Sequence, residues 1–257
     1  MEVDHFLAEL GVEEARRYDR QLRVLGSDRQ LLLKKSHVLV VGAGGLGSAV
    51  LYYLTAAGIG RITVVDNGVI ELSNLNRQIL YTTKDVGKHK IDVLKKKLKE
   101  LNPYVEIVGI KERFNDILAE RLIPKVDVVV DALDNWETRF IVNRYCVRYN
   151  KPLVHAGVEE SYGQLLTIVP GRGPCLQCVF PRKPRVKTPI PVLGPLPGIL
   201  GALEALEVIK LLTGYGKPSI GKLLLFDGFH MSFMEVGVKR NPKCPVCGRS
   251  SSTTDSN

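Results

Sequence analysis

Residues 38–49 read VLVVGAGGLGSA, an apolar run followed by a glycine-rich turn. Such a run is typical of a buried strand in a parallel sheet. Gly42, Gly44 and Gly47 satisfy the pattern G-x-G-x-x-G, and a helix is predicted over 45–57 directly after the strand. Glycines let the backbone approach a phosphate closely, and a helix amino terminus offers N–H donors to it. The stretch therefore predicts a nucleotide-binding turn rather than a glycine turn without a ligand.

A carboxylate follows at a suitable distance. Asp66 ends the next apolar run, RITVVD, about 20 residues after Gly47. At the end of a neighbouring strand, a carboxylate can accept hydrogen bonds from ribose hydroxyls. On these residues alone NAD is the usual nucleotide, so a nicotinamide-dependent oxidoreductase is one candidate function.

Strand and helix patterns alternate on both sides of the motif. Repeated strand–helix–strand units predict an α/β fold, a Rossmann-like doubly wound and mostly parallel sheet. The expected strands lie at 37–42, 61–66, 105–110, 126–133 and 152–157, and the expected helices at 4–18, 45–57, 88–100, 115–122 and 136–149.

The pattern changes after residue 160, where period-2 alternation indicates half-exposed antiparallel strands. Strands are expected at 161–169, 222–228 and 233–239, and a helix at 198–214. The length of 257 residues allows one large core. We expect a single domain over 1–248, with a helical arm (1–30), a nucleotide-binding part (31–160), an antiparallel and zinc-binding part (161–248), and a disordered tail (249–257).

Composition limits the surroundings of the protein. The amino terminus MEVDHFLAEL lacks the basic and apolar regions of a signal peptide, and the apolar runs are too short to span a bilayer. We therefore expect a cytoplasmic protein without a membrane partner. The 36 basic and 27 acidic residues give a net charge of +9, which favours a polyanionic partner: nucleic acid, a nucleoside triphosphate or an acidic protein.

Four of the five cysteines form two C-x-x-C pairs, Cys175 with Cys178 and Cys244 with Cys247. In a cytoplasmic protein this spacing favours a metal over a disulfide. Four thiolates complete a tetrahedral zinc site and leave no open position for a substrate, so its expected role is structural. A zinc-ribbon protein that binds nucleic acid is a second candidate, although aromatic residues do not alternate with basic ones near the cysteines. Cys146 is interpreted as a buried core residue.

The segment after Asp66 does not suit a dehydrogenase. Arg77 and Lys90 could neutralise the phosphates of a triphosphate, and Asn74 could hydrogen-bond them. Asp134 follows a predicted strand and could bind magnesium through a hard oxygen ligand. Because ligands bind at the carboxyl ends of such strands, these residues together favour a triphosphate site.

Several motifs now occur in one order along the chain. They resemble the ThiF/MoeB/HesA family of E1-like enzymes, which activate ubiquitin-like proteins, and the presence of both cysteine pairs is most similar to the MoeB-type branch. The motifs are RYDRQ (17–21), GAGGLG (42–47), SNLNRQ (73–78), DVGKHK (85–90), ALDN (132–135), CLQC (175–178), LLTGYGKP (211–218) and NPKCPVCG (241–248).

The resemblance implies ATP-dependent adenylation of the carboxyl-terminal Gly-Gly carboxylate of a small ubiquitin-like or sulfur-carrier protein, with release of pyrophosphate. It also implies that Arg20 enters the active site of the neighbouring subunit, so that the enzyme is a symmetric homodimer. No nucleic acid partner is expected. The residues that the resemblance assigns to the nucleotide are Gly45, Asp66, Ser73, Asn74, Arg77, Lys90, Asp134 with Mg²⁺, and Asn135.

Two departures from the family pattern stand out. Relatives often have a second carboxylate two residues after the first, where this chain has Gly68. Many relatives also carry a cysteine that accepts the activated protein, and here Lys187 and Thr188 stand at about that place. We therefore expect an enzyme that stops at the acyl-adenylate. A catalytically silent E1-like partner subunit is the main alternative, although Arg20, Arg77, Lys90 and Asp134 are all retained.

The proline-rich segment around Lys187 is basic. No acidic residue lies between Glu160 and Glu204, whereas five basic residues do. One hypothesis is a semi-rigid wall that guides an acidic ubiquitin-like partner and its tail towards the nucleotide. The alternative is a poorly ordered surface crossover.

Overall fold

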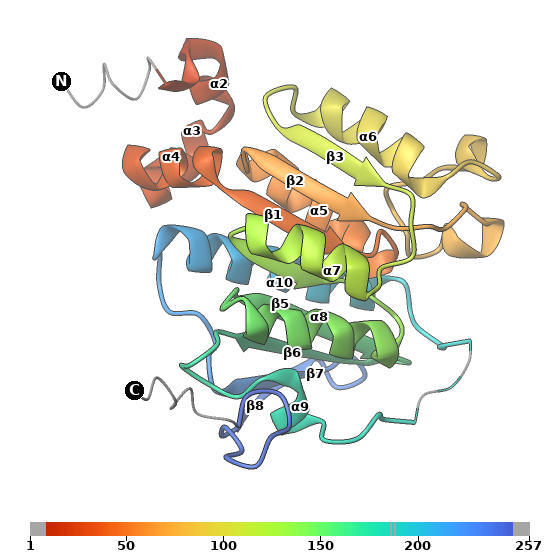
Figure 1. The fold of residues 1–257 in the computed structure, drawn as a ribbon. Helices are drawn as coiled ribbons and strands as arrows, with labels where there is room; N and C mark the ends of the chain where they lie inside the picture. The colour runs from red at the N-terminus through yellow and green to blue at the C-terminus, as the bar shows by residue number, and fades with distance from the viewer. Residues whose placement is uncertain (1–8, 186, 188, 249–257) are drawn as a thin grey trace.

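The computed structural model describes residues 9–185, 187 and 189–248 (Figure 1). One eight-stranded sheet runs in the order β3-β2-β1-β4-β5-β6-β7-β8. The first five strands are parallel, and the last three continue the sheet in antiparallel fashion, as the sequence predicted. The strands are β1 (His37–Val41), β2 (Arg61–Val65), β3 (Glu106–Ile110), β4 (Val128–Asp131), β5 (Leu153–Glu159), β6 (Tyr162–Ile168), β7 (Lys222–Asp227) and β8 (Ser232–Gly237).

The centre of the sheet is built from valine-rich strands. β1 pairs with β4 in parallel register from Val38 with Val128 to Val41 with Asp131. All of β4, and β1 after His37, are buried, because helices cover both faces. Burial of each such valine contributes roughly 1.5–3 kcal/mol to the hydrophobic term of folding.

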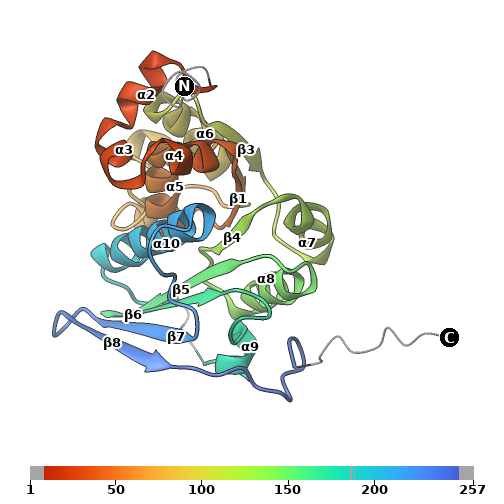
Figure 2. The same cartoon turned by 90° about the vertical axis from the view of Figure 1, so that its left-hand side faces the viewer.

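Helices form a layer on each face of the sheet (Figures 1 and 2). On one face α5 (Gly45–Ala57), α6 (Lys90–Leu101) and α10 (Pro195–Thr213) pack into one apolar core. On the other face α7 (Asp116–Leu122), α8 (Trp136–Arg148) and the short α9 (Leu176–Val179) form a second core. Short 3-10 turns lie at η1 (Leu72–Asn74), η2 (Thr83–Asp85) and η3 (Ile123–Lys125).

The amino-terminal arm differs from its prediction. Instead of one helix over 4–18, the described part has α2 (Val12–Arg17), α3 (Asp19–Leu25) and α4 (Ser27–Lys35). Gly11 has a positive φ of 78°, which ends helical geometry before α2. Tyr18 separates α2 from α3, and its buried hydroxyl accepts a hydrogen bond from Asn102 at 2.9 Å. The predicted helix is therefore interrupted at Gly11, while the break at Tyr18 lies at its predicted end.

The late helix α10 begins at Pro195, three residues before its predicted start. Proline suits a first helical turn because its missing N–H would have no intrahelical partner there. α10 also approaches α5 closely at Gly201, where a Cβ would lie 2.6 Å from the Leu46 carbonyl oxygen. The helix ends at Gly214, which has a left-handed conformation.

None of the helices within residues 9–248 that the structure describes is long and apolar enough to cross a membrane. The tail predicted to be disordered, 249–257, lies outside the described residues, as do residues 4–8 of the predicted first helix.

Candidate nucleotide site and cysteine cluster

A cleft of about 1010 Å³ opens at the carboxyl ends of the central parallel strands. β1 leads into α5 on one face of the sheet and β4 leads into α8 on the other, so the cleft lies where the chain switches sides. This is the usual ligand site of doubly wound sheets. The predicted site residues that line it are Gly42, Gly44, Gly45, Asp66, Arg77, Lys90, Asp134 and Asn135.

Glycine is needed for different reasons at the three positions of the motif. Gly42 has a φ of 100°, and a Cβ there would lie 2.5 Å from the Ala132 carbonyl oxygen. A Cβ at Gly47 would clash with the Gly42 carbonyl, and Gly47 does not line the cleft. A Cβ at Gly44 would meet only the Gln78 side chain at 3.8 Å, which leaves the cleft side open. Packing therefore requires glycine at 42 and 47, while Gly44 gives access to the backbone.

Both backbone polar groups of Ala43, in the glycine turn, are hydrogen-bonded to side chains. Asp66 accepts the Ala43 N–H through Oδ2 at 2.7 Å and the Gly68 N–H through Oδ1 at 2.7 Å. The Tyr81 hydroxyl donates to the Ala43 carbonyl at 2.9 Å. Burial raises the pKa of Tyr81, so its hydroxyl stays protonated and remains a donor. Asp66 thus shapes the turn in addition to any contact with a nucleotide.

Two cationic residues, Arg77 and Lys90, line the cleft. Arg77 donates to the Ser73 carbonyl at 2.9 Å and to Asn76 Oδ1 at 3.0 Å, which fixes one end of its guanidinium. Lys90 is the first residue of α6, and its backbone N–H donates to the Gly68 carbonyl at 3.0 Å. A Cβ at Gly68 would lie 3.2 Å from Lys90 Nζ, so the ammonium lies directly over this turn. Both residues therefore contribute positive charge to the cleft.

Four of the residues predicted for nucleotide binding or catalysis are not among those that line the cleft: Arg20, Gly47, Ser73 and Asn74. Asn74 Oδ1 accepts the Glu71 N–H at 3.1 Å, and the Ser73 hydroxyl donates to the Glu71 carboxylate at 3.3 Å. These side chains stabilise the turn that carries Arg77. Arg20 is exposed on α3.

The turn between β4 and α8 places Asp134 and Asn135 at the cleft. Asn135 caps α8, since its Oδ1 accepts the Thr138 N–H at 2.9 Å. Leu133, the residue before Asp134, donates its N–H to Asp131 and accepts a hydrogen bond from Arg139 through its carbonyl oxygen. The backbone next to Asp134 is therefore held by two buried charged side chains.

Buried polar groups behind the cleft were missed by the sequence reasoning. Asp131 and His155 are fully buried, and His155 Nδ1 lies 2.7 Å from Asp131 Oδ2. Burial lowers the pKa of His155, although the Asp131 carboxylate opposes the shift. Glu204 on α10 is also fully buried, and neither carboxyl oxygen has a hydrogen-bond partner among the described residues. Burial, and then the charge of Asp131, raise the pKa of Glu204 well above its usual range.

Gln78 is a further cleft residue that the prediction left out. Its side chain is only 5% exposed, and its Oε1 accepts no hydrogen bond within the described part of the chain. It follows Arg77 directly in the sequence, and its amide lies beside Gly44. The signal in the sequence that could have identified Gln78 is its position in the SNLNRQ motif.

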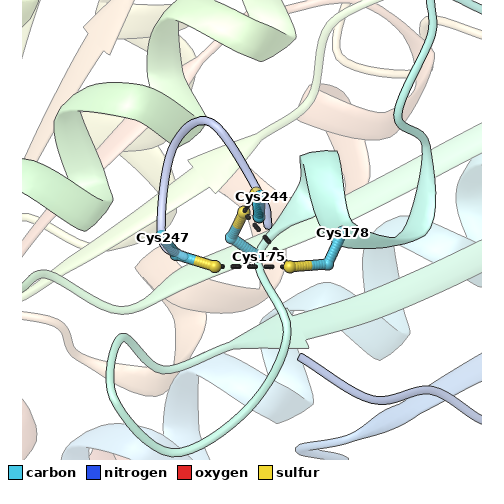
Figure 3. Close-up of side chains that lie close together, drawn as sticks. All are labelled: Cys175, Cys178, Cys244 and Cys247. Carbon is cyan, nitrogen blue, oxygen red and sulfur yellow. Dashed lines mark hydrogen bonds between the residues drawn. The ribbon is translucent and has the colours of Figure 1, made fainter. Parts of the chain in front are cut away.

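The four paired cysteines converge, as predicted (Figure 3). The Sγ atoms lie within 4.8 Å of one another, with 3.6 Å between Cys175 and Cys244 and 3.3 Å between Cys178 and Cys247. Zinc–sulfur bonds of about 2.3 Å in a tetrahedron place the sulfurs about 3.8 Å apart. The four thiols therefore fit a zinc ion. Cys146 is fully buried in α8, as expected, and burial raises the pKa of its thiol.

The basic segment forms part of the cleft wall. Lys183, Pro184, Arg185, Pro189 and Ile190 line the cleft, while Val186 and Thr188 lie outside the described residues. Acidic residues from elsewhere compensate part of its charge: Lys183 pairs with Glu137 at 2.6 Å, and Lys187 pairs with Glu160. The Glu160 N–H donates to the Pro191 carbonyl, and the Leu193 N–H donates to the Glu160 carbonyl, so two backbone hydrogen bonds attach the segment to the β5–β6 turn.

Comparison with known proteins agrees with this geometry. The chain is 45% identical to a sulfur carrier protein adenylyltransferase of Thermus thermophilus, with 92% of each chain covered. It is 40% identical to the SAMP-activating enzyme E1 of Haloferax volcanii, over 90% of this chain and 88% of that one. The crystal structure of E. coli MccB with ATP superposes with a TM-score of 0.78 at 29% identity, over 90% of this chain and 74% of that chain. Residues 18–246 match the model of the ThiF family, and the chain belongs to that family.

Proposed function

We propose that this protein is an adenylyltransferase that uses ATP to activate the carboxyl-terminal Gly-Gly carboxylate of a small ubiquitin-like or sulfur-carrier protein. The products are an acyl-adenylate and pyrophosphate. The observation that carries the proposal is the meeting of the glycine turn with Arg77, Lys90 and Asp134 in one cleft. The relatives named above, described as an adenylyltransferase and an E1 enzyme, support it.

The chemistry suits these residues. A terminal carboxylate is ionised at neutral pH, so its attack on the α-phosphorus needs no general base. The site has to hold the carboxylate in line with the phosphorus and to neutralise the charge that develops on the phosphates. Arg77 and Lys90 supply that positive charge, and the N–H groups at the start of α5 add donors.

Magnesium fits the other side of the cleft. Asp134 supplies a hard oxygen ligand, and Asn135 lies beside it at the start of α8. A bound Mg²⁺ would neutralise part of the triphosphate charge. The hydrogen bonds at Leu133 restrain the backbone next to this carboxylate.

Zinc in the cysteine cluster has a structural role in this proposal. Four thiolates saturate a tetrahedral ion, so the metal would join the loop after β8 to α9 and take no part in the reaction. Arg20, which stays outside the cleft of its own chain, contributes to the site of the second subunit of a homodimer. Exposed apolar side chains on α3, α4 and α5, namely Val24, Leu32 and Tyr53, are available for such a subunit contact. A cytoplasmic location stays a prediction.

The enzyme stops at the acyl-adenylate. Four of its thiols belong to the metal cluster, and the fifth, Cys146, is fully buried. A sulfur donor or an amine supplied by another protein would therefore attack the adenylate.

Pyrophosphate exchange into ATP tests the function. The protein is incubated with ATP, labelled pyrophosphate and each member of a panel of small proteins that end in Gly-Gly. Exchange with one of them, and its loss when the terminal glycine is removed, is the expected result. Binding of ATP without exchange for any member would favour a silent partner subunit, and binding of NAD in place of ATP would favour an oxidoreductase.

A further inference from the structure

The cysteine cluster is attached to α8 by a buried hydrogen bond. Cys175 is the N-cap of α9, and the next residue, Leu176, donates its N–H to Asn143 Oδ1 at 2.9 Å. Both Leu176 and Asn143 are fully buried. Because an unpaired N–H would be unfavourable there, this bond fixes the first cysteine pair against the middle of α8.

A contact between two aromatic rings also joins the end of α9 to the start of α8. Phe180 directly follows α9, and its ring centroid lies 4.9 Å from that of Trp136 with the planes tilted by 57°. Trp136 is the first residue of α8 and is 5% exposed. The Arg139 guanidinium also packs on this ring, with its carbon 5.0 Å from the ring centroid. Tilted aromatic pairs attract beyond the burial of their area, so Phe180 restrains the start of α8.

The start of α8 is also one edge of the nucleotide cleft. Asp134 and Asn135 directly precede Trp136, and Arg139 holds the carbonyl of Leu133. Cys175, Cys244 and Cys247 belong to the same apolar core as Trp136, so packing is continuous from the cluster to the cleft. Any change in the cysteine cluster that moves α9 therefore acts on the turn that carries Asp134.

We propose that metal binding at the cysteine cluster and nucleotide binding in the cleft are coupled through α8, with Asn143 and Phe180 as positioning residues. The inference rests on the proposed function, because it takes zinc as the metal and ATP as the nucleotide. Zinc fixes α9, and α9 fixes the start of α8 and hence Asp134. By linkage the coupling is reciprocal, so bound ATP also raises the affinity of the cluster for zinc.

The test uses the zinc-loaded protein and its Asn143→Ala variant. Asn143 does not line the cleft, so any effect on ATP is transmitted through the helix. The rate of zinc release is measured with a chromogenic chelator. The Kd of MgATP is measured by titration. Trp136 is the only tryptophan, so its emission reports on the contact with Phe180. We expect faster zinc release, a red-shifted emission, and a Kd raised about three- to tenfold, the size expected for loss of one buried contact.

Asn102→Ala is the matched control. Asn102 is also fully buried, and its amide donates to the Thr55 carbonyl and the Tyr18 hydroxyl on the opposite side of the sheet from α8. This variant should lose a similar amount of stability, yet keep the zinc release rate, the tryptophan emission and the Kd of the parent protein.

Two results would overturn the coupling: faster zinc release in Asn143→Ala with an unchanged Kd, or equal changes of the Kd in both variants. If Asn143→Ala does not fold, the parent protein is stripped of zinc stepwise with EDTA while circular dichroism monitors its folding. The Kd should then rise as zinc is lost from folded protein, and a constant Kd refutes the proposal. Failure of the zinc-loaded parent to bind MgATP at all would instead reject the proposed function, and this inference with it.

Discussion

Asp66 Oδ2 accepts the backbone N–H of Ala43 at 2.7 Å, so the carboxylate that follows β2 holds the glycine turn that follows β1. The Tyr81 hydroxyl holds the carbonyl of the same residue. Nucleotide affinity should therefore depend on side chains that need not touch the nucleotide, because they set the direction of the N–H groups around Gly44.

Tyr81→Phe tests this arrangement. Loss of the hydroxyl leaves the buried Ala43 carbonyl without its donor, which should lower the free energy of unfolding by about 1–3 kcal/mol and raise the Kd of MgATP severalfold. Tyr18→Phe is the control, because its hydroxyl is also buried and hydrogen-bonded but belongs to the amino-terminal arm. Equal Kd values for the two variants would show that the contact to Ala43 is only structural.

Lys90→Ala and Asp134→Ala test the assignment of the reacting site. Each should lower the rate of pyrophosphate exchange on the order of 100-fold, because each removes charge that stabilises the transition state. Lys84→Ala, on the exposed turn η2, controls for the loss of a nearby positive charge and should exchange normally. Normal exchange in Lys90→Ala would mean that the site residues are wrongly assigned even though the fold holds.

Mixing two inactive variants tests the shared site. In a homodimer in which Arg20 acts on the neighbouring subunit, Arg20→Ala and Lys90→Ala chains form mixed dimers with one complete site. Random mixing in equal amounts should restore about one quarter of the parent activity. No recovery after the subunits have exchanged would place Arg20 outside the site of its partner.

The lack of a usable thiol predicts that no thioester forms. After reaction with ATP and a cognate Gly-Gly protein, a non-reducing gel should show no adduct that hydroxylamine or thiol removes. A labile adduct that disappears in Cys146→Ala would contradict the interpretation of Cys146 as a core residue.

Glu204 should make stability fall with rising pH. Its pKa is raised in the folded protein, so the buried carboxyl stays neutral while the unfolded chain ionises above about pH 4.3. The unfolded state then binds fewer protons, and the free energy of unfolding decreases by up to about 1.4 kcal/mol per pH unit until the folded pKa is reached. The free energy of unfolding is measured with denaturant at several pH values between about 5 and 8. Plotted against pH, it should fall less steeply for Glu204→Gln than for the parent. Equal slopes would mean that Glu204 is already ionised in the fold.

Most of the fold could be predicted from the sequence because its signals are local. The apolar run before Gly42 predicted β1. The periodic stretch after it predicted α5 with the same first and last residues that the structure has. The single helix predicted over 4–18 was wrong because Gly11 takes a positive φ and interrupts it. The sequence shows the glycine, but periodicity along the segment does not show its conformation.

Residues of the nucleotide cleft could be predicted only where they belong to a sequence motif. Arg77, Lys90 and Asp134 stand in segments with a recognisable pattern, and the structure brings them to one cleft. Tyr81 and His155 lie in ordinary apolar surroundings, and their partners come from other strands or turns. Such contacts depend on which segments the fold brings together. The periodicity of a single segment contains no information about its partners.

The sterics of the glycine turn also limit what can be learned about relatives of this chain. Gly42 and Gly47 are required by contacts inside the protein itself, with Ala132 and with one another. A descendant that lost catalysis would still need both glycines to fold. Their presence therefore distinguishes a folded chain from an unfolded one, whereas an active subunit has to be distinguished from a silent one at Lys90 and Asp134, whose side chains the fold can do without.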